Sequence, residues 1–260
     1  MTFFLQSELT TNDNGFIEKN RYEILFAVKL IQQDGKNALV YNEELDMYFK
    51  NPRATTSIYE VELNKIVLHL SDRLEKAEDF IRRAMYRYDW IQPKVNMKGE
   101  VISIENKEES KKQWIKIKDK LKNDYKGEAV DEYLAKLSLE LDTEQPVYPA
   151  LSQYFPFGLL FPAIPEKHGK NWERKRIIEL SPYEEEQFEE QAVYEETTDG
   201  NRQYAIKGSL LPDSQSELET FEGYMIVPVN ETFPVKTEIN TSITKDGIIS
   251  QWKFELERYL

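Results

Sequence analysis

The sequence predicts an α+β fold that is rich in β-structure. It places an antiparallel meander, a curved sheet or half-barrel, in the C-terminal third and inserts two or three helices between residues 71 and 145. Three observations predict this fold class. Apolar and polar residues alternate on both sides of Asp246-Gly247. The turn pairs Asp34-Gly35, Lys98-Gly99 and Asp199-Gly200 separate other apolar runs. Between residues 72 and 141, apolar residues recur instead at helical spacing.

The closing hairpin is the clearest local prediction. Apolar or β-branched residues occupy every second position from Val235 to Ile243, and a second alternating run extends from Ile248 to Leu256. A period of two gives a strand one buried face and one wet face. Asp-Gly tolerates the positive φ angles of a tight two-residue turn. We therefore expect an antiparallel hairpin with its tip at residues 246–247.

The same reasoning extends the meander toward the middle of the chain. Around Asp199-Gly200, Phe188, Ala192 and Tyr194 share one face of the incoming arm, and Tyr204, Ile206 and Leu210 share one face of the outgoing arm. The expected strands of the meander are 173–180, 187–198, 202–211, 219–229, 235–245 and 248–258. The first half of the chain adds expected strands at 21–31, 37–41, 58–69, 89–96 and 100–105.

Three helices are expected between these groups of strands. Ser71 is a suitable N-cap for a helix over 72–86, and Asn106 for a second helix that ends before Gly127. A third begins at Glu128 and ends before Pro146. These elements divide the chain into an N-terminal β-rich part with one helix (1–105), a helical insertion (106–145) and the C-terminal meander (146–260). All three could belong to one domain.

Composition and charge exclude several classes of protein. The 260 residues contain 40% hydrophobic residues, enough for a real core, and no cysteine, which excludes disulfides and thiolate chemistry. The net charge is −13. Residues 181–222 hold twelve acids against Arg202 and Lys207, a balance of −10, whereas residues 91–126 hold ten lysines against six acids, a balance of +4. An acidic chain of this kind is not expected to bind nucleic acid.

No motif in the sequence predicts an active site, a metal site or a cofactor. The GxSxG, P-loop and GxGxxG patterns are absent. His69 is expected at a strand end and His168 in a polar surface loop, and they form no metal-binding spacing. The acidic run at residues 184–190 lacks the alternating Asp/Asn pattern and central Gly of a calcium loop, so we expect a solvated acidic turn there.

Residues 146–165, PVYPALSQYFPFGLLFPAIP, are named here the aromatic segment. Five prolines exclude a regular helix or a central strand, although the segment is strongly apolar. One interpretation is a buried crossover beneath the sheet. The alternatives are an apolar pocket lining or plug on the concave side, or a docking loop with aromatic anchors. The residues expected to bind a partner or ligand are Tyr154, Phe155, Phe157, Leu160 and Phe161.

These observations favour a non-catalytic protein, such as a subunit or adaptor of a larger assembly, whose partner is another protein or a second copy of the chain. The alternative is a carrier of an apolar, lipid-like ligand on a curved half-barrel. A second alternative is an enzyme that acts on glycans through dispersed carboxylates. The chain has no run of about 20 apolar residues and no recognisable signal peptide, so a cytoplasmic location is expected, or export with the signal removed.

Overall fold

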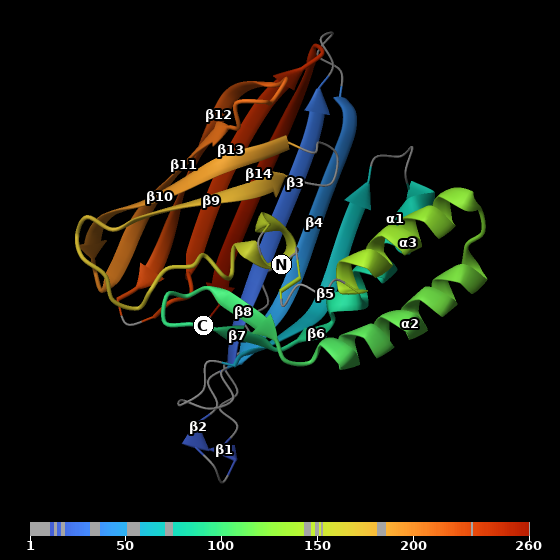
Figure 1. Ribbon diagram of the computed structural model, residues 1–260, viewed down its shortest axis with the longest axis horizontal. Coiled ribbons are helices and arrows are strands. Elements are labelled where there is room, and N and C mark those ends of the chain that lie inside the picture. The colour runs from blue at the N-terminus through green and yellow to red at the C-terminus, as the bar shows by residue number, and fades with distance from the viewer. Residues whose placement is uncertain are drawn as a thin grey trace, which may run out of the picture.

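The dominant feature of the computed structural model is one ten-stranded antiparallel sheet (Figure 1), in the order β6-β5-β4-β3-β14-β13-β12-β11-β10-β9. The structure describes residues 11–12, 15–16, 19–31, 37–50, 58–70, 75–142, 147–148, 151, 153–180, 186–229 and 231–259. The N-terminal part contributes β3 (Lys19–Ile31), β4 (Asn37–Lys50), β5 (Glu60–Leu70) and β6 (Trp90–Ile91). The C-terminal part contributes β9 (Glu173–Leu180), β10 (Glu186–Thr198), β11 (Asn201–Leu210), β12 (Glu217–Pro228), β13 (Lys236–Lys245) and β14 (Ile248–Tyr259).

The predicted C-terminal meander is confirmed. Strands β9 to β14 each pair with the next along the chain. At the two Asp-Gly tips, φ is 51° at Asp199 and Asp246, 77° at Gly200 and 76° at Gly247. Positive φ at both central residues is the conformation that joins twisted strands through a two-residue turn. The final strand, β14, pairs with β3, so strands from both ends of the chain lie side by side in one sheet.

The first half of the chain departs from the sequence prediction in two places. Strand β4 extends to Lys50 rather than ending at residue 41, because it pairs along its length with β3 and β5. Pairing on both sides outweighs the weak strand preference of its acidic residues. The expected strand 89–96 is divided into β6 and β7 (Pro93–Val95), and β7 pairs with β8 (Val101–Ile104) in a separate sheet. A small sheet of β1 (Thr11–Asn12) and β2 (Gly15–Phe16) precedes β3, and Asp34-Gly35 lies outside the described residues.

The three predicted helices are confirmed as α1 (Glu75–Met85), α2 (Lys107–Asp124) and α3 (Glu128–Asp142). A short 3-10 turn, η1 (Tyr86–Tyr88), follows α1. Ser71 lies outside the described residues. Asn106 is at the N-cap of α2, but its side chain bonds elsewhere: Oδ1 accepts from the Gln92 N–H at 2.7 Å, and Nδ2 donates to the Trp90 carbonyl at 3.0 Å. It therefore ties the start of α2 to the edge of the sheet.

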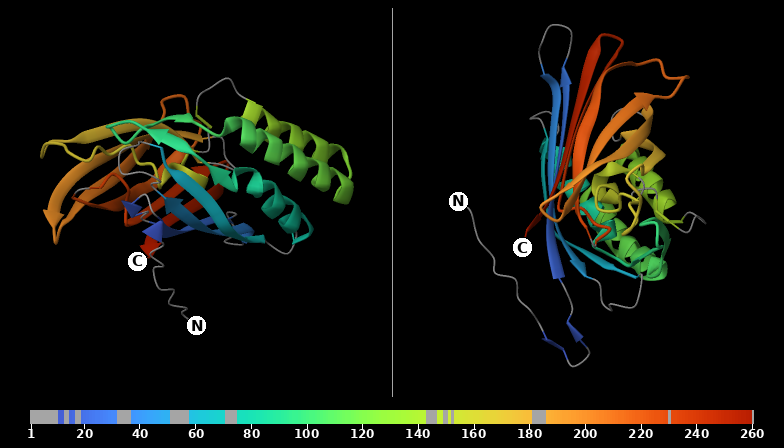
Figure 2. Two further views of the ribbon diagram at one scale, coloured as in Figure 1. Left: turned by 90° about the horizontal axis from the view of Figure 1, so that it is seen from below. Right: turned by 90° about the vertical axis from the view of Figure 1, so that its left-hand side faces the viewer.

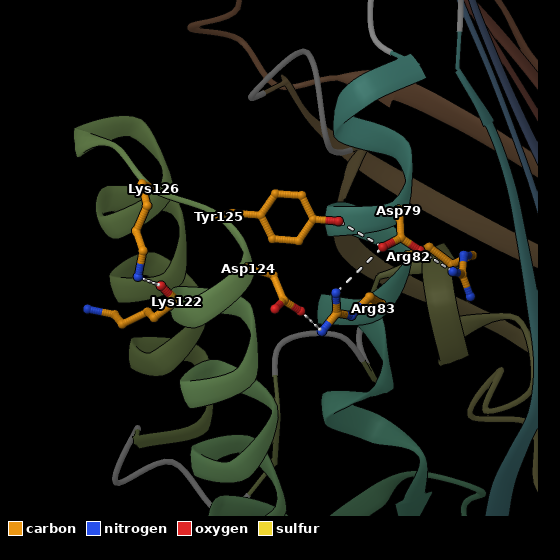
Figure 3. Close-up of polar contacts among 7 residues, drawn as sticks. All are labelled: Asp79, Arg82, Arg83, Lys122, Asp124, Tyr125 and Lys126. Carbon is orange, nitrogen blue, oxygen red and sulfur yellow. Dashed lines mark hydrogen bonds and ion pairs between the residues drawn. The ribbon is translucent and has the colours of Figure 1, made fainter.

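Polar contacts join α1 to the C-terminal end of α2 (Figure 3). The Tyr125 hydroxyl donates to Asp79 at 2.7 Å, and Arg83 donates to Asp124 at 2.7 Å. Hydrogen bonds from Tyr125 and Arg82 hold the pKa of Asp79 below its usual range, although partial burial opposes them. Because these groups are largely exposed, the contacts orient the helices more than they stabilise them.

The helices and the aromatic segment lie on the same side of the large sheet (Figure 2), which we call the inner face. In Figure 1 the helices stand beside β5 and β6, and the aromatic segment crosses in front of the middle of the sheet. The buried core lies between the inner face and these covering elements. Among the described helices, none is both long enough and apolar enough to cross a membrane.

Candidate ligand-binding site

The inner face of the C-terminal meander is apolar because alternate residues of each strand point to it. On β14 the buried residues are Ser250, Trp252, Phe254 and Leu256, and their direct neighbours on β13 include Ile239, Thr241 and Ile243. Other strands add large buried side chains to the same interior: Phe188, Tyr204, Ile206, Phe221, Met225 and Val227. We call the buried region where this face packs against the aromatic segment the interior.

The aromatic segment is a buried crossover beneath the sheet. Tyr154, Phe157, Leu160 and Phe161 are each at most 3% exposed. The backbone of Phe155 lies in a single π-helical turn, η3 (Tyr154–Gly158), and its side chain lies outside the described part of the structure. Four of the five residues expected to bind a partner or ligand are therefore together in the interior and not at the surface.

Aromatic contacts fix the position of the segment against the sheet and the helices. The Tyr154 ring lies edge-on to Phe254 with centroids 5.0 Å apart, and Phe161 packs edge-on against Phe233 at 5.8 Å. Phe157 packs against Tyr88 of η1 at 5.8 Å. Edge-to-face pairs at these distances are favourable beyond the area they bury. The middle of the segment therefore contacts both β14 and the η1 turn, and Phe161 contacts the β12–β13 connection.

Side chains, rather than a backbone ladder, hold the C-terminal end of the segment. Its recorded backbone bonds are local, such as Leu160 N–H to the Phe157 carbonyl at 2.9 Å. The Pro162 carbonyl accepts a bond from Arg174, and the Pro165 carbonyl accepts one from Arg202 at 2.9 Å. The segment is thus attached to the sheet through a few arginine donors.

The β7–β8 hairpin supports the segment from its other side, and Gly99 makes this contact possible. A β-carbon at Gly99 would lie 2.5 Å from the Ile164 carbonyl oxygen, and the φ of Gly99 is +78°.

We expect Gly99→Ala to lower the free energy of unfolding by about 2 kcal/mol, because alanine is strained at this φ and its β-carbon also meets the Ile164 backbone. Thermal denaturation measures the loss. The matched control is Gly200→Ala, which shares the positive φ but meets no atom within 4 Å; equal losses in both variants would contradict the packing argument.

A charged cluster lies in the interior beside Tyr154. The Arg–Glu cluster consists of Arg174 and Arg176 on β9 and Glu190 on β10; the Glu190 side chain is 0% exposed, and those of Arg174 and Arg176 are 11% and 16% exposed. Arg174 pairs with Oε1 of Glu190, and Arg176 donates from Nε and Nη2 to Oε2 at 3.1 and 2.8 Å. The Arg176 guanidinium also lies 5.5 Å from the Tyr154 ring centroid. Within the described residues, two cations share one carboxylate.

Burial and the excess of arginine over carboxylate set the pKa values in the Arg–Glu cluster. Burial alone would raise the pKa of Glu190, but Arg176 and Arg174 outweigh it and lower that pKa. Burial and the neighbouring charge of Arg176 lower the pKa of Arg174 to about 10. Burial raises the pKa of Tyr154 well above its ordinary value. At neutral pH the cluster therefore carries one excess positive charge in an apolar setting.

Three further polar side chains of the inner face have no hydrogen-bond partner among the described residues. They are the Thr237 hydroxyl, the Thr241 hydroxyl and the Trp252 indole Nε1, and the side chains are at most 2% exposed. Thr241 is directly opposite Trp252, and Thr237 is opposite Leu256. Buried polar groups are normally paired, so three such groups on neighbouring strands are unusual.

His168 follows the aromatic segment in a loop, as the sequence predicts, and its ring is held by several contacts. Its Nε2 lies 2.5 Å from the Tyr204 hydroxyl, and its Nδ1 lies 2.9 Å from the Gly169 carbonyl oxygen. The ring also packs against Trp172 and Tyr194, with centroids 5.0 and 5.3 Å away. This aromatic cluster closes the interior near the tip of the β10–β11 hairpin. Burial raises the pKa of Tyr204 to about 12.

The expectation of a solvated acidic turn at 184–190 is wrong for Glu186 and Glu190, whereas the Glu189 side chain is 40% exposed. Glu186 and Glu190 lie in β10 and are 6% and 0% exposed. Glu186 accepts bonds from Ser214, Ser216 and Lys245. Glu190 shares the parity of Phe188 and Ala192, the two residues that predict the buried face, so the alternation itself could have located it. Residues 181–185 lie outside the described part.

Within the part of the chain that the structure describes, no group of three or more His, Asp or Glu side chains could hold a metal ion. His69 is in β5, with its backbone opposite Asn42, and its side chain is outside the described residues. The recorded carboxylates of the interior are engaged by arginine, lysine or serine.

Comparisons with known proteins leave the chain without a family. No family model matches the sequence, and no curated protein matches it. Among solved structures, the chain is similar to a structure described as lipid–protein interactions in lipovitellin, with a TM-score of 0.46 and 9% sequence identity. The match covers 93% of this chain but only 25% of the lipovitellin chain. A likeness at this level does not establish a shared function.

Proposed function

We propose that the protein is a non-catalytic carrier that binds an apolar, lipid-like molecule in the interior. The observation that carries this proposal is the way the apolar inner face is closed. A single irregular segment with local backbone bonds covers it, held to the sheet by aromatic contacts and arginine side chains. Displacing such a segment breaks far fewer backbone hydrogen bonds than displacing a strand. The aromatic segment then acts as a plug that an apolar ligand replaces.

The unpartnered groups of the inner face also support a ligand rather than a simple core. A core that only stabilises the fold gains nothing from burying a hydroxyl or an indole N–H without a partner. A bound molecule with a hydrogen-bond acceptor would pair Trp252 and Thr241 in one step, because these two residues are directly opposite each other.

The second candidate function is a component of a protein assembly. Its docking-loop form required aromatic anchors at the surface, and the described anchors, Tyr154, Phe157, Leu160 and Phe161, are buried. Exposed apolar residues remain on the helices, with Leu139 of α3 70% exposed and Ile115 of α2 51% exposed. A protein partner would therefore dock on the surface of α2 and α3 and not on the aromatic segment.

Contact quenching tests the carrier proposal. A stearic acid brominated in mid-chain quenches only those tryptophans that it touches. We expect saturable quenching of wild-type emission, most of it lost in Trp252→Phe, because Trp252 lies in the interior. The matched control is Trp90→Phe, since Trp90 is 37% exposed at the β6 edge and should be unaffected by an interior ligand. Absence of quenching, together with a ligand-free native mass spectrum of the purified protein, would refute the proposal.

A further inference from the structure

Among the described side chains, the interior contains buried donors without a partner and two arginines that share one carboxylate. The Arg–Glu cluster sets two guanidinium groups against one carboxylate. Arg174 Nε, Trp252 Nε1 and the hydroxyls of Thr237 and Thr241 are buried and unpartnered. Each of these groups can donate a hydrogen bond, and neither arginine nor indole can accept one. Among the side chains that the structure describes, these groups have no acceptor with negative charge other than Glu190.

The unpartnered donors form two groups, one at the arginines and one on β13 and β14. The Tyr154 ring lies between them, 5.5 Å from the Arg176 guanidinium and 5.0 Å from the Phe254 ring. Phe254 shares the inner face with Trp252, two residues earlier on the same strand, and Trp252 is opposite Thr241. The segment that the ligand would displace thus carries the ring that separates the arginines from the other donors.

We propose that the ligand is an amphiphile with an anionic, acceptor-rich headgroup, a carboxylate or a phosphate monoester, which binds to Arg174 and Arg176 in the interior. Its apolar chain lies against Phe254 and the neighbouring inner-face residues. This inference rests on the carrier function proposed above and specifies its ligand class. An anion beside Arg174 balances the excess charge and accepts a hydrogen bond from the unpartnered Arg174 Nε.

Arg174 is the residue that sets the headgroup preference. Arg176 makes two bonds to Glu190, through Nε and Nη2, whereas Arg174 divides its donors between Glu190 and the Pro162 carbonyl. Arg174→Met leaves a one-to-one Arg176–Glu190 pair and should fold. Arg174→Lys keeps the charge at this position and is the matched control.

The test compares three ligands that share one brominated chain: the carboxylic acid, the phosphate monoester and the neutral alcohol. Tryptophan quenching gives each dissociation constant. We expect wild-type protein to bind one or both anions about 10- to 100-fold more tightly than the alcohol, as charge-assisted hydrogen bonds provide. The ratio of acid to phosphate ester then identifies the headgroup. Arg174→Met should remove the preference for anions, and Arg174→Lys should retain most of it.

Each other outcome has a definite meaning. Equal binding of all three ligands by wild-type protein overturns the headgroup inference and leaves the carrier function standing. Binding of none overturns both. A preference that survives in Arg174→Met, with circular dichroism showing an intact fold, overturns the assignment to this residue. The wild-type comparison decides the inference by itself if Arg174→Met does not fold.

Discussion

Glu190→Gln should lower the free energy of unfolding by about 3–5 kcal/mol, the range found when one partner of a buried ion pair is removed. The glutamine keeps the shape of the side chain, but it leaves Arg174 and Arg176 buried without an opposing charge. Urea denaturation at neutral pH gives the difference. Glu189→Gln is the control, since Glu189 pairs with Lys175 where both side chains are largely exposed and should change stability by less than about 1 kcal/mol. Similar losses in the two variants would show that the charge of Glu190 is not what matters.

The burial of Glu190 beside two arginines also predicts how the free energy of unfolding depends on pH. Because the arginines lower the pKa of Glu190 below its ordinary value of 4.5, its stabilising contribution is complete above that pH. It is lost as the pH falls through the lower, folded-state pKa, because in that range the unfolded chain binds the proton more readily than the folded protein does. The stability gap between wild type and Glu190→Gln should therefore narrow in acid. A gap that stays constant down to pH 2 would contradict the assignment.

Arg202→Met should cost about 3 kcal/mol or more, because several buried carbonyl groups lose a charged donor at once. Arg202 is 5% exposed and donates to the carbonyls of Pro165 and Glu166 at 2.9 Å each, to that of Pro228 at 3.2 Å, and to that of Glu231. It therefore fastens the end of the aromatic segment to the β12–β13 connection. We expect faster proteolysis near residues 165–170 as well as lower stability.

Arg82→Met is the reference for Arg202→Met, since Arg82 is an arginine of α1 whose side chain is 36% exposed and whose partner is Asp79. Removal of a partly exposed pair of this kind should change stability by less than about 1 kcal/mol. If Arg202→Met unfolds at the same denaturant concentration as Arg82→Met and resists protease equally well, the carbonyl contacts of Arg202 contribute little.

The meander could be predicted from the sequence because its signals are local. Asp246-Gly247 and the alternation around it depend only on neighbouring residues, and the hairpin forms as expected. The burial of Glu190 depends on two arginines on another strand, and a run of acids taken alone resembles a wet turn. Arg174 and Arg176 share a face with Ile178 and Leu180. Only the pairing of β9 with β10 places the Glu190 carboxylate beside the two arginines, where it offsets the cost of burying their charge.

The aromatic segment shows a different limit. Its prolines correctly exclude a regular strand or helix, and its apolar residues correctly indicate burial as one of the alternatives. Whether it lies inside or outside depends on which part of the inner face the helices leave uncovered. That is a property of the whole sheet and not of residues 146–165. The partners of Tyr154, which are Arg176 and Phe254, come from β9 and β14 and could not be assigned from spacing.

The pairing of β14 with β3 has a consequence for how the chain folds. Ile24 lies opposite Leu256, so segments more than 200 residues apart must meet before the sheet is complete. During synthesis, β3 emerges from the ribosome long before β14, and one edge of the early β3–β5 unit stays open until β14 is made. Folds that depend on such distant contacts form slowly, and open edges invite pairing with other chains. A newly made chain is therefore exposed to aggregation at this edge until β14 pairs with β3.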